Sequence, residues 1–314
     1  MNKTFSKIVA IGGGTGTSKV LTGLKPYDFD LTGIISTMDS GGSTGLLRKS
    51  FNIPAIGDLR KALIGLANND KLANKLTEIM GYRFPNDSEL NGHSLGNLMI
   101  LSSLLKNQKN LQQTIDEIGT LLNIKGKILP VSITPSTLYA QLSNGDILEN
   151  ESSIDTRKSS LDSYIEKVWI DPKINANPDA IAAINNADII IIGPGDLYTS
   201  IIPNFLVNGI AQSITSSKSK IFYVANISNK TEETANYRLS DFLKIIITHI
   251  GNSKVFDGII LNQPNNDVPL PIKYDLETCN ELTKEIYTAS IKSQQDNKTH
   301  DSKKLGEILY KVLS

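Results

Sequence analysis

The chain has 314 residues, of which 39% are hydrophobic and 20% are charged, proportions typical of a soluble globular protein. Lysine plus arginine and aspartate plus glutamate balance at 32 each, so no global charge attracts nucleic acid or an anionic membrane surface, and neither is expected as a partner. The single cysteine, Cys279, excludes an intramolecular disulfide framework and a cysteine-rich zinc site. Three histidines do not favour a histidine-cluster metal site, and no metal site is assigned.

The first residues, MNKTFSK, lead directly into an apolar run that is too short for a signal peptide. No stretch reaches the roughly 18 consecutive apolar residues that a transmembrane helix needs. We therefore expect a cytoplasmic protein that does not insert into a membrane.

From residue 8 onward, short runs rich in β-branched residues alternate with amphipathic segments. The apolar runs predict strands over residues 8–11, 30–39, 126–132, 188–196, 219–228 and 254–263. Helical spacing of apolar residues predicts helices over 17–24, 55–68, 97–107, 111–124, 177–187 and 301–314, with others around 200–216 and 240–250. This alternation predicts a Rossmann-like, doubly wound α/β fold with a mainly parallel sheet. No linker interrupts it, so residues 1–314 are expected to form a single domain.

Residues 136–151 depart from this rhythm because apolar and polar residues alternate on both sides of Asn144 and Gly145. An Asn-Gly pair in that setting predicts a β-hairpin with a type I′ turn. We therefore expect an inserted antiparallel piece around residues 135–170.

The first predicted strand ends in the glycine-rich segment that comprises Gly12, Gly13, Gly14, Thr15 and Gly16, directly before a helix. Unpaired N–H groups and the helix dipole make such a junction a seat for a phosphate or carboxylate. The spacing matches neither the P-loop pattern nor G-x-G-x-x-G. The alternative is a tight turn whose glycines serve close packing alone.

The second predicted strand runs into Asp39, which lies 23 residues after Gly16, where a doubly wound nucleotide binder places an acid for the ribose hydroxyls. The residues behind it supply hydroxyls and exposed N–H groups for a second anion cradle: Ser40, Gly41, Gly42 and Ser43. The alternative is an exposed, flexible turn.

Two further segments add polar residues near helix starts. Asp58 and Arg60 lie at the start of the helix predicted over 55–68. For Asp58 the alternative role is a helix cap. Arg60 offers a planar guanidinium that suits phosphate, and for it the alternative role is a structural ion pair. His93 and Asn97 precede and begin the next helix, where the dipole disfavours a charged imidazole. A purely structural histidine is the alternative there.

The strand predicted over 188–196 ends in a second glycine turn, with Gly193 and Gly195 followed by Tyr198, Thr199 and Ser200. Tyr198 could stack on a base or sugar, and the hydroxyls could meet a phosphate. No Ser-His-Asp or Cys-His arrangement is legible, so catalytic residues stay unassigned. Because parallel strands end at one edge of a doubly wound sheet, we expect these loops to converge on a diphosphate.

Five ordered motifs make the chain similar to the YvcK-type gluconeogenesis factors, which belong to the superfamily of 2-phospho-L-lactate transferases (CofD-like proteins). The motifs are GGGTG (12–16), DSGGSTG (39–45), GDLRKAL (57–63), GHSLGN (92–97) and GPGDLYTSIIPN (193–204). The resemblance runs from residue 8 to about 262. It implies a Rossmann-like fold, a UDP-sugar or NAD(P)-type nucleotide as ligand, and a role in cell shape and in growth on gluconeogenic carbon sources.

The resemblance leaves two functions open. One is a regulator without an obligatory cofactor that binds a nucleotide-type ligand and signals to a protein partner. The other is a transferase that uses a nucleoside-diphosphate donor and Asp39 or Asp58 with Mg²⁺. A homo-oligomer is compatible with either. Asp196 stands where the family usually has serine, and because a carboxylate repels phosphate, a cation must lie beside it if phosphate binds there.

Overall fold

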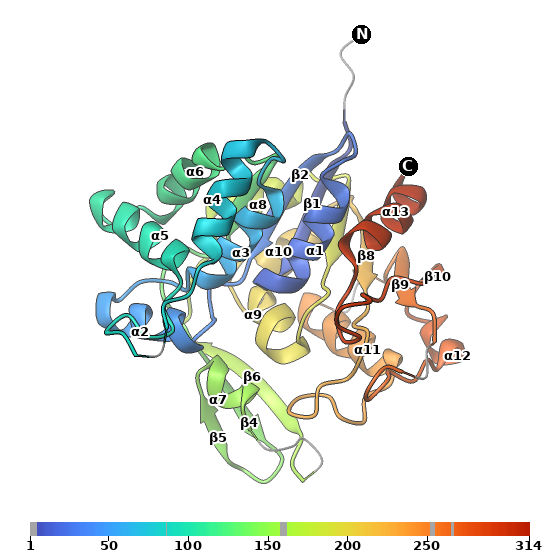
Figure 1. The fold of residues 1–314 in the computed structure, drawn as a ribbon. Coiled ribbons are helices and arrows are strands. Elements are labelled where there is room, and N and C mark those ends of the chain that lie inside the picture. Colours follow the sequence, from blue (N-terminus) through green and yellow to red (C-terminus); the bar gives the residue numbers. More distant parts are fainter. Residues whose placement is uncertain (1–4, 86, 158–161, 252–254, 265–266) are drawn as a thin grey trace.

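A seven-stranded parallel sheet forms the centre of the computed structural model, which describes residues 5–85, 87–157, 162–251, 255–264 and 267–314 (Figure 1). Its strand order is β10-β9-β8-β7-β1-β2-β3. The strands are β1 (Lys7–Gly12), β2 (Asp30–Ile35), β3 (Lys127–Pro130), β7 (Ile189–Ile192), β8 (Lys220–Val224), β9 (Gly258–Asn262) and β10 (Ile286–Ala289). The order reverses between β1 and β7, which is the point where doubly wound sheets form a ligand crevice. The predicted doubly wound α/β fold is confirmed.

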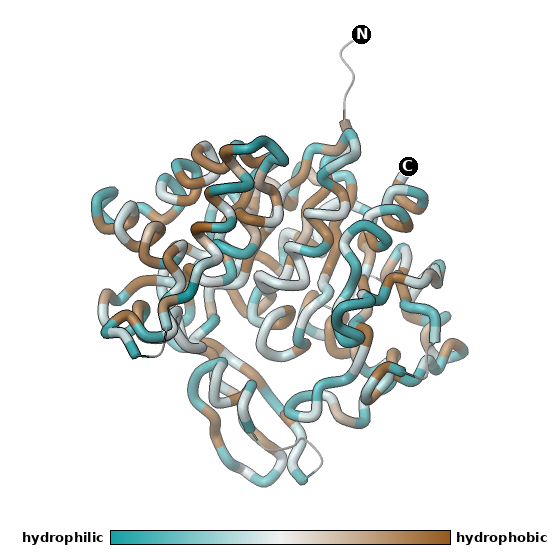
Figure 2. The backbone as a smooth tube through the Cα atoms, in the orientation of Figure 1, coloured by the Kyte–Doolittle hydropathy of each residue, from teal (hydrophilic) through white to brown (hydrophobic). Residues whose placement is uncertain are grey.

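The central strands are continuous apolar runs because helices cover both faces of the sheet. All four residues of β7 are buried, and successive residues of β1 point to opposite faces. Val9 and Ile11 belong to one hydrophobic core, whereas Ile8 and Ala10 belong to the other. Figure 2 shows apolar residues recurring through the centre of the molecule and hydrophilic residues at its outer turns.

Helices on each face bury their apolar stripes in the core of that face. On the side of Ile8 these are α1 (Gly14–Leu24), α3 (Gly57–Leu66), α5 (Leu95–Lys106), α6 (Leu111–Leu121) and α13 (Ser302–Leu313). On the side of Val9 they are α8 (Pro178–Asn185), α10 (Ile210–Ser216) and α11 (Leu239–Ile250). Helix α8 is capped by Asn177, whose side chain accepts a hydrogen bond from the Asp179 N–H, and Pro178 is its first residue.

The sequence pattern did not indicate the helices α2 (Gly42–Phe51), α4 (Lys71–Gly81) and α12 (Leu276–Cys279) or the strand β10. The helix predicted around 200–216 is divided into the π-helical turn Leu197–Ile201, α9 (Ile202–Phe205) and α10. Strands β2, β7 and β8 each end four residues before their predicted ends. The reason is that polar and glycine-rich residues at the carboxyl edge leave the sheet to form loops. No helix of the described chain combines the length and apolar character needed to cross a membrane.

The predicted insertion is confirmed as a separate antiparallel sheet, with the order β5-β4-β6, that extends beyond the carboxyl edge of the main sheet (Figure 1). Its strands are β4 (Thr137–Leu142), β5 (Ile147–Glu149) and β6 (Ile165–Asp171), and α7 (Glu151–Asp155) lies between β5 and β6.

The type I′ turn predicted for this hairpin is wrong. Gly145 has a φ of 91°, but Asn144 is not among the residues with positive φ, and a type I′ turn requires both. Instead, the Gly145 N–H donates to the Leu142 carbonyl and the Leu142 N–H donates to the Asp146 carbonyl. These bonds define a three-residue loop in which Gly145 forms a bulge after the turn.

Candidate functional site

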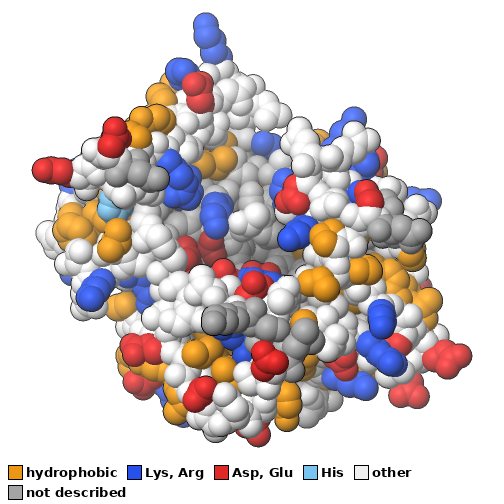
Figure 3. Space-filling view, turned by 60° about the horizontal axis from the view of Figure 1, so that its bottom comes forward, with side chains coloured by type: hydrophobic (Ala, Val, Ile, Leu, Met, Phe, Trp, Pro, Cys, Tyr) orange, Lys and Arg blue, Asp and Glu red, His pale blue; other side chains and the backbone are white. Residues whose placement is uncertain are grey.

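A cavity of about 610 Å³ opens at the carboxyl edge of the sheet, over the crevice between β1 and β7. This volume lies within the range of small-molecule sites. Its wall combines the glycine segment after β1, the loops after β7 and β8, α7 of the insertion, and the residues just before α13. Figure 3 shows the hollow, with basic side chains on one rim and acidic side chains gathered deep within it.

Nine residues that the sequence singled out share this wall. They come from the segments after β1, β2 and β7 and from the start of α3: Gly13, Gly14, Thr15, Gly16, Asp39, Asp58, Gly195, Thr199 and Ser200. The structure therefore brings the three predicted loops to one cavity, as expected for parallel strands that end at a common edge.

The glycines after β1 let α1 approach its neighbours closely. A Cβ added at Gly14 would lie 2.5 Å from Asp58 Oδ1 and 2.6 Å from Asp58 Cα, and one added at Gly16 would overlap the Pro194 carbonyl oxygen. The packing role that the sequence left open thus applies to both glycines. No side chain caps α1, and its first turn carries no acidic residue, so its leading N–H groups suit an anion in the cavity.

Other predicted residues lie outside the wall and bond to one another. Asn97 Nδ2 donates to Ser43 Oγ at 3.1 Å, Arg60 Nε donates to Asn97 Oδ1 at 2.9 Å, and Ser43 Oγ lies 2.9 Å from His93 Nδ1. These four side chains form a polar cluster between α2, α3 and α5. Their part in ligand binding stays a prediction.

The last group of predicted residues, namely Ser40, Tyr198 and four glycines, also lies outside the cavity wall. Ser40 joins the insertion, since its N–H donates to Glu151 Oε2 at 3.2 Å and its Oγ accepts from the Ser152 N–H at 2.9 Å. Tyr198 is buried, with its hydroxyl 2.7 Å from that of Tyr237, and so does not face the cavity as a stacking surface. Gly12, Gly41, Gly42 and Gly193 are likewise absent from the wall.

Three carboxyl groups line the side of the cavity nearest α2, α3 and the insertion: Asp39, Asp58 and Glu151. Lys61 Nζ lies 2.9 Å from Asp58 Oδ1. Burial, with the Asp58 charge as the next cause, raises the pKa of Asp39. Burial and the Asp39 charge raise the pKa of Glu151 to about 7. Burial is thus the first cause of both shifts, and the neighbouring acids add to it.

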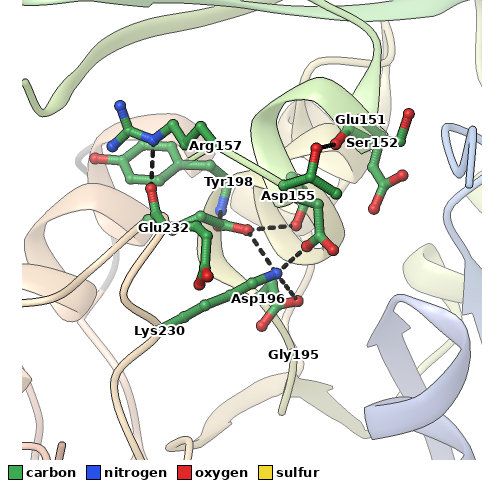
Figure 4. Close-up of polar contacts among 12 residues, drawn as sticks. Glu151, Ser152, Asp155, Arg157, Gly195, Asp196, Tyr198, Lys230 and Glu232 are labelled. Carbon is green, nitrogen blue, oxygen red and sulfur yellow. Dashed lines mark hydrogen bonds and ion pairs between the residues drawn. The ribbon is translucent and has the colours of Figure 1, made fainter. Parts of the chain in front are cut away.

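A second group of acids surrounds one lysine (Figure 4). Lys230 Nζ forms ion pairs with Asp155 of α7, with Asp196 Oδ2 at 2.8 Å and with Glu233 Oε1 at 3.4 Å. Lys230 thus places a cation beside Asp196, the condition that the sequence sets for phosphate binding there. Oxygens of the three acids lie within 4.8 Å of one another, a spacing that suits a metal ion, but the Lys230 ammonium lies among them. Burial, followed by the Glu233 charge, raises the pKa of Asp196 to about 8.

Glu233 holds the loop after β7 in place. Its buried carboxylate accepts hydrogen bonds from the Tyr198 N–H at 2.9 Å and from Thr199 Oγ1 at 2.7 Å. These bonds satisfy donors at the start of the π-helical turn. Glu233 thereby fixes the segment that carries Thr199 and Ser200 into the cavity wall.

Comparison with known proteins gives the family. The family model described as 2-phospho-L-lactate transferase CofD matches residues 8–300. The chain belongs to the CofD family. It is similar to the gluconeogenesis factor of Bacillus subtilis, with 33% identity over 321 residues that cover 98% of each protein. The gluconeogenesis factor of Halalkalibacterium halodurans is 38% identical over 262 residues, which cover 83% of this chain and 79% of that protein.

A solved structure of a similar protein has the same fold as this chain. A crystal structure titled as a member of the UPF0052 family from Bacillus halodurans matches with a TM-score of 0.90 at 32% identity and covers 98% of this chain and 100% of that one. The resemblance to gluconeogenesis factors in the CofD superfamily, predicted from five motifs, is confirmed.

Several wall residues of this CofD-family chain were missed by sequence reasoning: Glu151, Asp155 and Lys230, together with Glu233 behind the wall. The sequence could have indicated Lys230 and Glu233, because residues 226–237 follow β8, the strand next to β7, and therefore leave the sheet at the same edge. No comparable signal marked the insertion acids, since nothing local indicates that α7 faces the cavity.

Replacing Lys230 by methionine should lower the free energy of unfolding by about 1–3 kcal/mol, because the acids around it lose their cation while methionine keeps the apolar stem. Urea unfolding at neutral pH measures the change. Lys75→Met removes an exposed ion pair with Glu78 and should cost no more than about 0.5 kcal/mol. Equal effects of the two substitutions would show that the Lys230 cluster adds no special stability.

Proposed function

We propose that this CofD-family protein binds a UDP-sugar or a related nucleotide in the cavity at the β1–β7 crevice and acts as a cytoplasmic regulator. The observation that carries the proposal is the amino end of α1. Its N–H groups have no side-chain cap, and the segment Gly13–Gly16 shares one cavity wall with Gly195 across the strand-order reversal. A diphosphate is the ligand group that such a junction stabilises best.

The character of the wall favours a regulator over an enzyme. Ser43 does hydrogen-bond to His93, but that pair lies outside the wall. His300 lines the cavity with Nε2 only 3.1 Å from the Ala225 carbonyl oxygen, and burial lowers its pKa to about 4, so the ring is neutral. With so low a pKa the imidazole is a weak base, and its Nε2 is held by a backbone carbonyl, so His300 is a poor candidate for a general base. The relatives are named gluconeogenesis factors, which supports a role connected with gluconeogenesis. The regulator is proposed to act through a protein partner.

A transferase is the second candidate, and one observation favours it. Asp39 and Asp58 both line the cavity, with Asp58 beside Gly13 and Gly14, and their oxygens are the ligand type that Mg²⁺ prefers. The family model is itself described as a 2-phospho-L-lactate transferase. In this reading the two aspartates would hold a cation that polarises a nucleoside-diphosphate donor.

Calorimetry separates the two candidates. The full chain is titrated with UDP-N-acetylglucosamine, GDP and NADP, each with Mg²⁺ and with a chelator, and the nucleotides are analysed afterwards. Binding of the UDP-sugar without turnover supports the regulator. Consumption of a diphosphate donor over time would overturn the regulator in favour of the transferase, and no binding of any nucleotide would contradict both.

Asp39→Ala should weaken nucleotide affinity by about 1–3 kcal/mol, because it removes an acceptor at the end of β2 that faces the cavity. Calorimetry on folded protein, verified by circular dichroism, measures the loss. Asp30→Ala is the matched control, since Asp30 is exposed at the opposite end of the same strand and should leave affinity unchanged. An unaltered affinity in Asp39→Ala would remove Asp39 from the site.

A further inference from the structure

His300 lines the cavity with one of its two ring nitrogens committed to the protein. Its Nε2 lies 3.1 Å from the carbonyl oxygen of Ala225, the residue that follows β8. A carbonyl oxygen only accepts hydrogen bonds, so Nε2 carries the proton and donates it. Burial is the main cause that lowers the pKa of this imidazole to about 4, so the ring is neutral at pH 7. Nδ1 is therefore unprotonated and can only accept.

The Nδ1 atom of His300 is left open to the cavity. Among the described residues it has no hydrogen-bond partner, and it is not one of the unpartnered side-chain atoms that the protein covers completely. Asn229 Oδ1, from another stretch of the same wall, is one of those covered atoms. Because His300 itself belongs to the wall, its Nδ1 offers a ligand in the cavity an unused acceptor.

The backbone on both sides of His300 is held in place. The Ser293 N–H donates to the Thr299 carbonyl at 2.8 Å, and the Asp301 N–H donates to the Ile291 carbonyl at 2.8 Å. Asp301 also caps α13 through its side chain. The position of the open acceptor is thus fixed before a ligand arrives, which reduces the entropy lost when a ligand binds to it.

The strand order indicates which part of a nucleotide sugar meets this acceptor. In the order β8-β7-β1-β2, the glycine segment follows β1, Asp39 follows β2, and His300 bonds to the end of β8. Neighbouring strands lie about 4.8 Å apart, so the ends of β2 and β8 are separated by about 14 Å across the crevice. A diphosphate at the amino end of α1 lies between them. With the ribose at Asp39, as in doubly wound nucleotide binders, the sugar beyond the diphosphate extends toward His300.

The chemistry of Nδ1 favours a sugar over a phosphate as its partner. The oxygens of an ionised diphosphate only accept hydrogen bonds, so a phosphate oxygen and the Nδ1 lone pair would face each other without a proton between them. Sugar hydroxyls and the N–H of an acetamido group are donors. The group that satisfies Nδ1 is therefore a donor on the sugar.

We propose that His300 is a specificity-determining residue for the sugar of a nucleoside diphosphate sugar, with Nδ1 accepting a hydrogen bond from a sugar hydroxyl or amide. The inference rests on the proposed nucleotide-binding function and places the sugar on the β8 side of the cavity. A nucleoside diphosphate that lacks a sugar gains no affinity from this acceptor.

Two substitutions separate the roles of the two ring nitrogens. Glutamine places an amide N–H near the position of Nε2, and asparagine places a carbonyl oxygen near that of Nδ1. His300→Gln therefore keeps the bond to Ala225 and loses the open acceptor, whereas His300→Asn does the reverse. In urea unfolding without ligand, His300→Asn should have the lower midpoint, because the buried Ala225 carbonyl loses its donor.

Calorimetry with UDP-N-acetylglucosamine and with UDP measures the role of His300 in binding. His300→Gln should raise the dissociation constant of the nucleotide sugar about tenfold, because a sugar donor loses its acceptor, and that of UDP less than twofold. His300→Asn should stay within about threefold of the parent for the nucleotide sugar. His249→Gln is the matched control: His249 Nδ1 also contacts a backbone carbonyl, that of Ile245, but lies outside the wall, and both affinities should stay unchanged.

Three results would overturn the inference while leaving the proposed function intact. The first is an unchanged affinity of His300→Gln for the nucleotide sugar. The second is an equal loss for UDP, which would place His300 against the nucleoside diphosphate instead of the sugar. The third is a folded His300→Asn protein that loses as much affinity as His300→Gln. If neither ligand binds the parent chain, the proposed function fails, and the inference fails with it.

Discussion

Gly16→Ala is expected to abolish nucleotide binding and to lower the free energy of unfolding by about 3 kcal/mol. A Cβ at this position would overlap the Pro194 carbonyl oxygen and lie 2.6 Å from the Pro194 carbonyl carbon. Both are backbone atoms, which cannot rotate away as a flexible side chain can, so α1 or the loop after β7 must move. Overpacking at a tight contact costs in this range. Because both segments line the cavity, the same movement separates the groups that would hold the diphosphate.

Urea unfolding and calorimetry on the same preparation measure the two effects of Gly16→Ala. The matched control is Gly81→Ala at the end of α4, where an added Cβ meets nothing within 4 Å. That variant should bind normally and stay within about 0.5 kcal/mol of the parent. Normal stability and affinity in Gly16→Ala would show that the close approach of α1 to the loop after β7 is dispensable.

Glu233→Ala is expected to lower the free energy of unfolding by about 3–5 kcal/mol. The substitution removes the acceptor of the Tyr198 N–H and of Thr199 Oγ1, and both donors lie in a buried turn with little access to water. It also removes one partner of Lys230. Orphaned buried donors together with a broken buried ion pair produce losses of this size.

Glu233→Gln separates the hydrogen bonds from the charge. Glutamine keeps one carbonyl acceptor at nearly the same place, so its loss should be smaller than that of alanine. Glu232→Ala is the neighbouring control: Arg157 contacts the Glu232 backbone carbonyl, which alanine retains, and the cost should stay within about 1 kcal/mol. Thermal and urea unfolding measure all three variants. A Glu233→Ala protein as stable as the parent would mean that the turn does not depend on this carboxylate.

The prediction of the fold from the sequence succeeded where a signal was local. The run Ile189–Ile192 is buried on both faces and could only be a central strand, and the helix that starts at Pro178 carried its own cap. Helix α4 was missed although the Asp70 side chain caps it and its apolar residues recur at helical spacing. Only two of its residues are buried, so the helix lies at the surface and contributes little to the core. The hairpin was found but its turn type was not, because an Asn-Gly pair is compatible with more than one loop geometry.

The candidate site was predictable only in part. Glycines and acids directly after strands β1, β2 and β7 could be placed at one edge, because every parallel strand ends there. The Ser43, His93, Asn97 and Arg60 side chains were grouped with them by proximity in the sequence, yet the structure turns them toward one another. The direction of a side chain depends on the packing of its helix, which the local pattern does not contain.

By itself, the sequence determined the family, the glycine-rich strand ends and most of the alternating strands and helices, because each of these is a pattern within a few tens of residues. Only the tertiary structure decided that Lys230 meets Asp155, 75 residues away, and Asp196, 34 residues away. The physical reason is that the crossovers of a doubly wound sheet and the position of the insertion bring distant segments together at one edge. The charge pattern of the cavity therefore exists only in the folded chain.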